Sequence, residues 1–113
     1  MQTTLSQTQL VLQPTLTRCK QELVQHYGAK FKALILYGSA AREQLTPQSD
    51  IDLLVLLESP LDYFKELRTL VDLLYPIQLE ATYWISAKPA ATEEFEQGLT
   101  QLYRNIQQDG ILL

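Results

Sequence analysis

The sequence predicts a small α/β (α+β) domain, in which a mixed sheet of three or more strands is flanked by helices. Two apolar runs, residues 31–37 and 51–57, are typical of buried strands. A third run, residues 77–83, alternates apolar and polar side chains, which is typical of a strand with one polar face. Apolar residues between these runs recur at helical spacing. We expect one domain over residues 1–113, because this length supports a single core.

The first helix is predicted to begin near Pro14 and to end at Gly28. Proline is favoured in the first turn of a helix, and glycine commonly follows the last turn. The apolar face of this helix consists of Leu16, Cys19, Leu23 and Tyr27. Residues 1–13 are rich in Gln and Thr, and we expect them to form a loose N-terminal extension.

A glycine–serine pair, Gly38 and Ser39, directly follows the first predicted strand. We expect a short helix from Ser39 to about Gln44, ending before a turn at Pro47. The second strand, residues 51–57, begins soon after this turn.

Two longer helices complete the predicted fold. Residues 61–74 place apolar side chains on one helical face, and we expect Pro76 to end this helix before the third strand. Thr92 is placed to cap a last helix, which Gly110 is expected to end.

The charge of the chain argues against a surface that binds nucleic acid. The formal net charge is -4, with nine Lys and Arg against thirteen Asp and Glu. The basic residues are scattered, whereas contacts to a phosphate backbone need clustered Lys and Arg. We therefore expect no direct binding of nucleic acid.

No feature of the sequence predicts membrane association or export. No apolar run approaches the ~18 residues of a membrane span, and Met1–Gln9 lacks the basic-then-apolar order of a signal peptide. The single Cys19 has no second cysteine with which to form a disulfide. We expect a cytoplasmic protein.

Two carboxylates one residue apart, at the start of the second strand, predict a metal site. Asp50 and Asp52 project to the same side of a strand, where they repel each other unless a cation lies between them. Mg²⁺ favours carboxylate and phosphate oxygens. A third carboxylate on an adjacent strand would complete the site, and Glu80 is the best candidate because it lies on the polar face of the predicted third strand.

The residues between the first two strands predict a phosphate site beside this metal site. Gly38 lets the backbone approach a phosphate closely and permits a positive φ. Ser39 offers a hydroxyl and a backbone N–H, and Arg42, one turn later, could clamp a phosphate. Together, the two sites indicate a metal-dependent nucleotide site.

This spacing resembles the signature of the DNA polymerase β-like nucleotidyltransferase superfamily. Residues 38–43 read Gly-Ser-Ala-Ala-Arg-Glu, and residues 49–55 read Ser-Asp-Ile-Asp-Leu-Leu-Val. Within the superfamily, the chain most resembles the minimal nucleotidyltransferases (MNT), the antitoxin half of HEPN/MNT toxin–antitoxin pairs. It departs from their pattern at Glu43, where glycine is common, and at Glu80, where the third carboxylate is often aspartate.

The resemblance implies a nucleotidyltransferase core without an acceptor domain. It implies that Asp50, Asp52 and Glu80 are catalytic residues that hold two Mg²⁺ ions, and that Gly38 and Ser39 hold phosphates of ATP. A hydroxyl would attack the α-phosphorus of ATP and release pyrophosphate. For an antitoxin of this type, the acceptor would be a tyrosine of the HEPN ribonuclease toxin, which adenylylation neutralises. We therefore expect a hetero-oligomer with a cognate toxin.

Two alternatives remain open at this point. The chain could transfer a nucleotide to a small-molecule acceptor, although the stretch after Glu80 has room only for one helix and a tail. It could instead be a non-catalytic antitoxin that acts by binding and occlusion.

Overall fold

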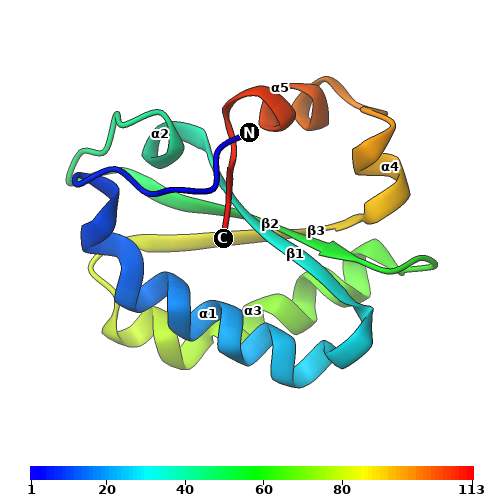
Figure 1. Ribbon diagram of the computed structural model, residues 1–113. Helices are drawn as coiled ribbons and strands as arrows, with labels where there is room; N and C mark the ends of the chain where they lie inside the picture. Colours follow the sequence, from blue (N-terminus) through cyan, green and yellow to red (C-terminus); the bar gives the residue numbers. More distant parts are fainter.

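The computed structural model describes residues 1–113 as a four-stranded mixed sheet with helices on both faces (Figure 1). The strand order is β3-β2-β1-β4. The strands are β1 (Phe31–Tyr37), β2 (Asp50–Leu57), β3 (Trp84–Ala91) and β4 (Ile111–Leu112). Strand β1 pairs antiparallel with β2 and with β4, whereas β2 and β3 are parallel. The predicted mixed sheet flanked by helices is confirmed.

Helices α1 (Gln13–Tyr27) and α3 (Tyr63–Glu80) cover one face of the sheet, below it in Figure 1. The larger part of the hydrophobic core lies here, with the following buried side chains from the two helices: Leu16, Cys19, Leu23, Leu70, Leu74 and Ile77. Burying each large apolar side chain contributes on the order of 2 kcal/mol. Burial also raises the pKa of the Cys19 thiol to about 11, so this cysteine is a protonated core residue.

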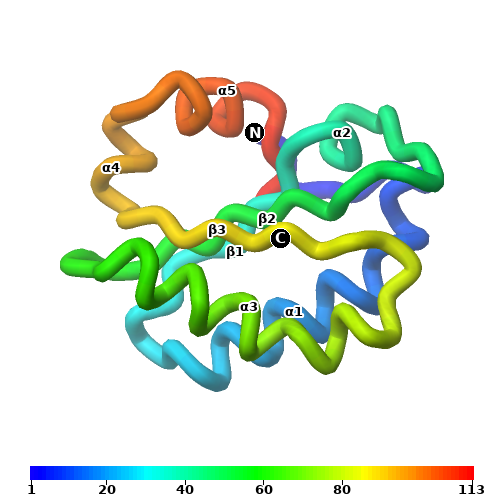
Figure 2. Tube along the Cα trace, turned by 180° about the vertical axis from the view of Figure 1, so that it is seen from behind, coloured from blue at the N-terminus to red at the C-terminus, as the bar shows by residue number.

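Three shorter helices lie over the opposite face (Figures 1 and 2). They are α2 (Gly38–Ala41), α4 (Thr92–Glu96) and α5 (Gln101–Asp109). Phe95 and Ile106 pack in a second cluster against the strand residues Ile35 and Leu54. The single last helix predicted from the sequence is thus two helices, because Gly98, with φ +62°, turns the chain between them.

The N-terminal residues are part of the packed fold, in contrast to the expected loose extension. The backbone N–H of Gln2 donates to the Gly110 carbonyl (3.0 Å), and the Leu112 N–H donates to the Gln2 carbonyl (2.6 Å). A 3₁₀ turn, η1 (Gln9–Leu12), then leads into α1, and both of its terminal residues are buried.

Helix α3 continues through Pro76 to Glu80, so the strand predicted over residues 77–83 is wrong. Leu70, Leu74 and Ile77 are buried at helical spacing on both sides of the proline. Because this face packs on the sheet, burial carries the helix past a residue that usually ends one.

The third strand of the sequence lies further along, at Trp84–Ala91. The Gln78 side chain fixes the connection that leads to it. Its Nε2 donates to the Tyr83 carbonyl (3.2 Å), and its Oε1 accepts from the Ile85 N–H (2.6 Å). Pro89 is tolerated within β3 because β3 is an edge strand, which needs ladder hydrogen bonds on one side only.

None of the helices could cross a membrane, since none combines the required length with sufficient apolar content. The longest helix, α3, has 18 residues, among which are the charged side chains of Lys65, Glu66, Arg68, Asp72 and Glu80.

Candidate active site

Asp50 and Asp52 stand at the start of β2, on the face of the sheet opposite α1 and α3. Ile51 and Leu53 alternate with them and are buried in the core under those helices. The alternation of a strand therefore directs both aspartates to the other face. Asp50 is exposed and Asp52 is half-buried, so the pair is accessible from solvent.

The strand register places three side chains next to this pair. Asp52 lies opposite Tyr37 of β1 and opposite Ser86 of β3, and Asp50 lies opposite Trp84. The Tyr37 hydroxyl is buried without a hydrogen-bond partner. Burial and then the charge of Asp52 raise the pKa of Tyr37 to about 12, so this phenol stays protonated at neutral pH.

Gly38 lies directly against Asp52. Its φ is +74°, a conformation that side chains rarely adopt, and a Cβ added there would stand 3.2 Å from Asp52 Cγ and closer still to Oδ2. The structure therefore brings the glycine–serine pair and the aspartate pair to one place, although they lie in different segments of the chain.

The buried Gln9 side chain holds α2 in position. Its Nε2 donates to the carbonyls of Ala40 (2.8 Å) and Ala41 (2.9 Å), and its Oε1 accepts from the Ser6 N–H (2.9 Å). All polar atoms of this amide are thus used, and the turn at Gly38 is anchored to the N-terminal segment.

The loop after α2 retains the backbone shape that glycine would favour. Glu43, at the position where the sequence departs from the superfamily pattern, has φ +60°. A non-glycine residue in this region costs on the order of 1 kcal/mol, and its side chain can still point to solvent. Glu43 therefore replaces the usual glycine without changing the left-handed backbone conformation at this position.

The charges around Asp52 leave its carboxylate only partly compensated. Burial and then the neighbouring Asp50 raise its pKa, whereas the charges of Lys88 and Arg42 act in the opposite direction. Neither cation forms an ion pair, because the chain has a single salt bridge, which lies elsewhere. A divalent cation at the pair would relieve this repulsion.

Glu80 does not join the aspartates. It is the last residue of α3, and its Oε2 accepts from Arg18 Nη1 at 2.5 Å in an exposed ion pair. No three His, Cys, Asp or Glu side chains of the chain gather in a way that could hold a metal ion. The placement of Glu80 on a strand beside Asp50 and Asp52 was therefore wrong.

The donor set of the aspartate pair fits one hard divalent cation. Two carboxylates on one accessible face, next to a turn that can receive phosphate, match the preference of Mg²⁺ for one or two carboxylates plus substrate phosphates. Carboxylate ligands for a second ion are missing from the neighbouring strands.

Sequence reasoning missed Lys88, Tyr37 and Gln9 as parts of this site. Lys88 was hidden because β3 was placed too early in the chain. Tyr37 directly precedes the glycine–serine pair, so its position at the end of the first predicted strand was a usable signal. Gln9 acts through a long-range contact that no local pattern reveals.

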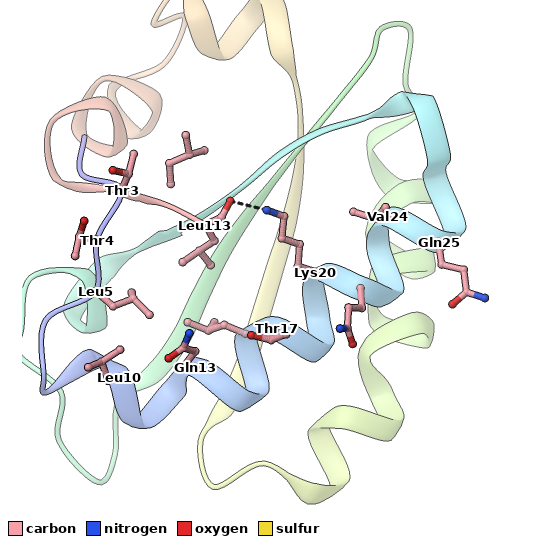
Figure 3. Close-up of a pocket in the computed structure, with 13 residues that line it drawn as sticks. Thr3, Thr4, Leu5, Leu10, Gln13, Thr17, Lys20, Val24, Gln25 and Leu113 are labelled. Atoms are coloured by element: carbon pink, nitrogen blue, oxygen red, sulfur yellow. Dashed lines mark hydrogen bonds between the residues drawn. The ribbon is translucent and has the colours of Figure 1, made fainter.

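A large cavity lies elsewhere, between the N-terminal segment, α1 and the C-terminal residues (Figure 3). It measures about 770 Å³, and neither aspartate lines it. Its lining contains no Asp, Glu, His or Cys, and Lys20 donates across it to the Leu113 carbonyl (3.0 Å). This cavity therefore lacks the carboxylates that would hold a metal ion for phosphoryl transfer.

Comparison with known sequences finds one protein family and one related protein. The model of the family described as "Nucleotidyltransferase domain" matches residues 16–113. A protein of Methanocaldococcus jannaschii, described as a candidate protein adenylyltransferase, is 31% identical over 88 residues, which are 77% of this chain and 82% of the relative.

Comparison with solved structures supports the same fold. The crystal structure of a tyrosine-to-alanine mutant of the toxin–antitoxin pair MntA–HpeT matches with a TM-score of 0.53 and 18% identity. The match covers 83% of this chain and 68% of the other. At this identity, the likeness concerns the fold.

Proposed function

Because this chain belongs to the nucleotidyltransferase domain family, we propose that it is an antitoxin that transfers AMP from ATP to a tyrosine hydroxyl of a cognate HEPN toxin. The observation that carries the proposal is the close approach of Gly38 to Asp52, which would place a phosphate in the turn next to a metal ion at the carboxylate pair. The name of the M. jannaschii relative and the toxin–antitoxin neighbour support a protein as the acceptor.

Each site residue has a role in this proposal. Asp50 and Asp52 would hold Mg²⁺, which when bound would neutralise phosphate charge and polarise the reacting phosphorus. Gly38 and Ser39 would receive the β- and γ-phosphates through the backbone and the hydroxyl. Arg42, whose side chain has no hydrogen bond or ion pair in the structure, would clamp the same phosphates.

The proposed reaction is an in-line displacement at the α-phosphorus of ATP. The phenolic oxygen of the acceptor forms the new P–O bond, and the bond to the departing pyrophosphate breaks. The phenolic proton leaves to solvent. The products are the adenylylated tyrosine and pyrophosphate. The protein contributes positioning and charge neutralisation rather than covalent chemistry.

The surface beside Asp50 suits an acceptor carried by another protein. Trp84, opposite Asp50 in the sheet, is 64% exposed. Val71 and Tyr75 of α3 are also exposed, and together with Trp84 they line a groove of about 240 Å³ between α3 and β3. Exposed apolar side chains that adjoin a reactive site are typical of a protein-docking surface. Because β3 is the edge strand, a toxin seated here would extend its tyrosine around this edge to reach the aspartate pair on the opposite face.

A labelling experiment tests the proposal. The chain is incubated with Mg²⁺, α-labelled ATP and the protein encoded by the neighbouring gene, which the proposal identifies as the toxin. Asp52→Asn is the test variant, and Asp72→Asn, on the exposed surface of α3, is the matched control. We expect label on the toxin with the wild type and with the control, and a loss of about 100-fold or more with Asp52→Asn.

The other outcomes identify the alternatives. Label that appears on a small molecule and not on the toxin would indicate a small-molecule nucleotidyltransferase. Neutralisation that persists in Asp52→Asn without any label would indicate an antitoxin that acts by occlusion.

A further inference from the structure

Strand β3, which pairs with the aspartate-bearing strand β2, has a lysine and no carboxylate on the face where a third carboxylate was expected. On the face that holds Asp50 and Asp52, the parallel strand β3 presents Trp84, Ser86 and Lys88, because Ile85 and Ala87 between them pack into the core on the other face. None of these three residues is an acid. The neighbouring strand β1 contributes only Tyr37 at this point.

The register of the sheet places Lys88 two residues from the position opposite Asp52. Ser86 lies directly opposite Asp52, and Lys88 follows two residues later on the same face. The small serine leaves the long lysine side chain free to reach back toward the aspartate.

The Lys88 ammonium is not used by the fold. Lys88 is exposed, it forms no salt bridge, and the single ion pair of the chain joins Arg18 to Glu80. The Lys88 ammonium is therefore available to a ligand.

Charge balance limits how many cations this site can take. Lys88 and Arg42 carry two positive charges near the two carboxylates, so one divalent ion makes the formal charge of the site positive, as a triphosphate requires. A second divalent ion would have no carboxylate of its own and would be repelled by the lysine ammonium beside it.

We propose that Lys88 stands in place of a third carboxylate, so that Asp50 and Asp52 hold one divalent cation and the Lys88 ammonium contacts the phosphates of the nucleotide. This inference rests on the proposed function, which it refines in two ways. It reduces the expected two ions to one, and it adds a phosphate-contacting residue on β3.

The proposal predicts opposite effects of one substitution on two ligands. Without the ammonium, Mn²⁺ meets less repulsion, so Lys88→Gln should bind Mn²⁺ alone about threefold more tightly. The same variant should bind a non-hydrolysable ATP analogue, at saturating Mn²⁺, about tenfold more weakly. A loss of structure would weaken the binding of both ligands. Tighter Mn²⁺ binding together with weaker binding of the analogue therefore indicates a ligand contact and not a structural role.

Electron paramagnetic resonance gives the number of Mn²⁺ ions bound per chain and their affinity, and calorimetry gives the affinity for the ATP analogue. We expect one Mn²⁺ per wild-type chain and tighter Mn²⁺ binding in Lys88→Glu, which adds a carboxylate, than in Lys88→Gln. Lys65→Glu, on the exposed surface of α3, matches the charge change and should stay within twofold of the wild type.

Several results would overturn the inference. Two equivalent Mn²⁺ ions on the wild type would contradict the single-cation site, and parallel or absent shifts in Lys88→Gln would remove the lysine from it. Mn²⁺ binding that persists unchanged in Asp52→Asn would instead count against the proposed function, since the ion would then not lie at the aspartate pair.

Discussion

Gly38 leaves the space that the Asp52 carboxylate occupies. At φ +74°, a side chain at position 38 would overlap Asp52 Oδ2. The turn that would receive phosphate and the carboxylate that would hold the metal are therefore in contact before any ligand binds. This contact makes the two motifs parts of one site.

Gly38→Ala should abolish AMP transfer. The added methyl group would displace the Asp52 carboxylate, and we expect at least about a 100-fold loss of transfer rate. The strained backbone should also cost about 1–3 kcal/mol of unfolding free energy. Transfer assays and denaturant unfolding measure the two effects.

Gly28→Ala is the matched control for this variant. Gly28 also has a positive φ, +57°, but a Cβ there would meet nothing within 4 Å. It should show a similar stability loss with transfer retained. Equal losses of transfer in both variants would mean that strain, and not the contact with Asp52, explains the effect.

Gln9→Ala should weaken the site from a distance. The variant leaves two buried carbonyls of α2 without their donor, at a cost of about 1–3 kcal/mol. A less firmly held turn at Gly38 should raise the KM for ATP several-fold. Gln7→Ala, an exposed neighbour, should change neither value, and an unchanged KM in Gln9→Ala would show that the turn does not need this anchor.

Glu80→Gln should leave transfer unchanged within about twofold. The Glu80–Arg18 ion pair is exposed, and such pairs contribute about 0.5 kcal/mol. Transfer rate and Tm are the measurements, with Arg18→Gln as the matched variant. A 100-fold loss confined to Glu80→Gln would return this residue to the catalytic site.

The thermal stability of the metal-free protein should depend on whether Asp52 is protonated. Because its pKa is raised in the folded state, the folded protein holds this proton more tightly than the unfolded chain does. The stabilisation from this proton is fully present at a pH below 3.8, the ordinary pKa of an aspartate. It is lost as the pH rises through the raised pKa of the folded state. The Tm of the wild type should therefore fall relative to that of Asp52→Asn as pH rises from 3.5 to 7.

Mg²⁺ should reverse this difference at neutral pH. The ion binds the ionised carboxylate, so it should raise the Tm of the wild type and leave Asp52→Asn nearly unchanged. A Tm difference between the two proteins that is independent of both pH and Mg²⁺ would contradict this assignment.

Local signals were sufficient to predict the elements that surround the site. The buried runs of β1 and β2 and the amphipathic face of α1 agree with the packing that the fold requires, so their bounds were predicted nearly correctly. The spacing of Gly38 and Asp50 was also informative, because Gly38 follows β1 and Asp50 begins β2.

Glu80 shows where local patterns fail. Residues 77–83 satisfy a period of two, but Ile77 also continues the helical period of Leu70 and Leu74, and burial against the sheet selects the helix. Strand β3 was hidden because Lys88 and Pro89 are typical of loops, and only its position at the sheet edge makes the proline acceptable.

The mass of the toxin after reaction tests the central claim most directly. The toxin is incubated with the chain, ATP and Mg²⁺, and its intact mass and peptides are measured by mass spectrometry. We predict the addition of adenylyl groups on a tyrosine with the wild type and none with Asp52→Asn. A toxin that is neutralised by the wild type with its mass unchanged would contradict the claim that this chain acts by nucleotide transfer.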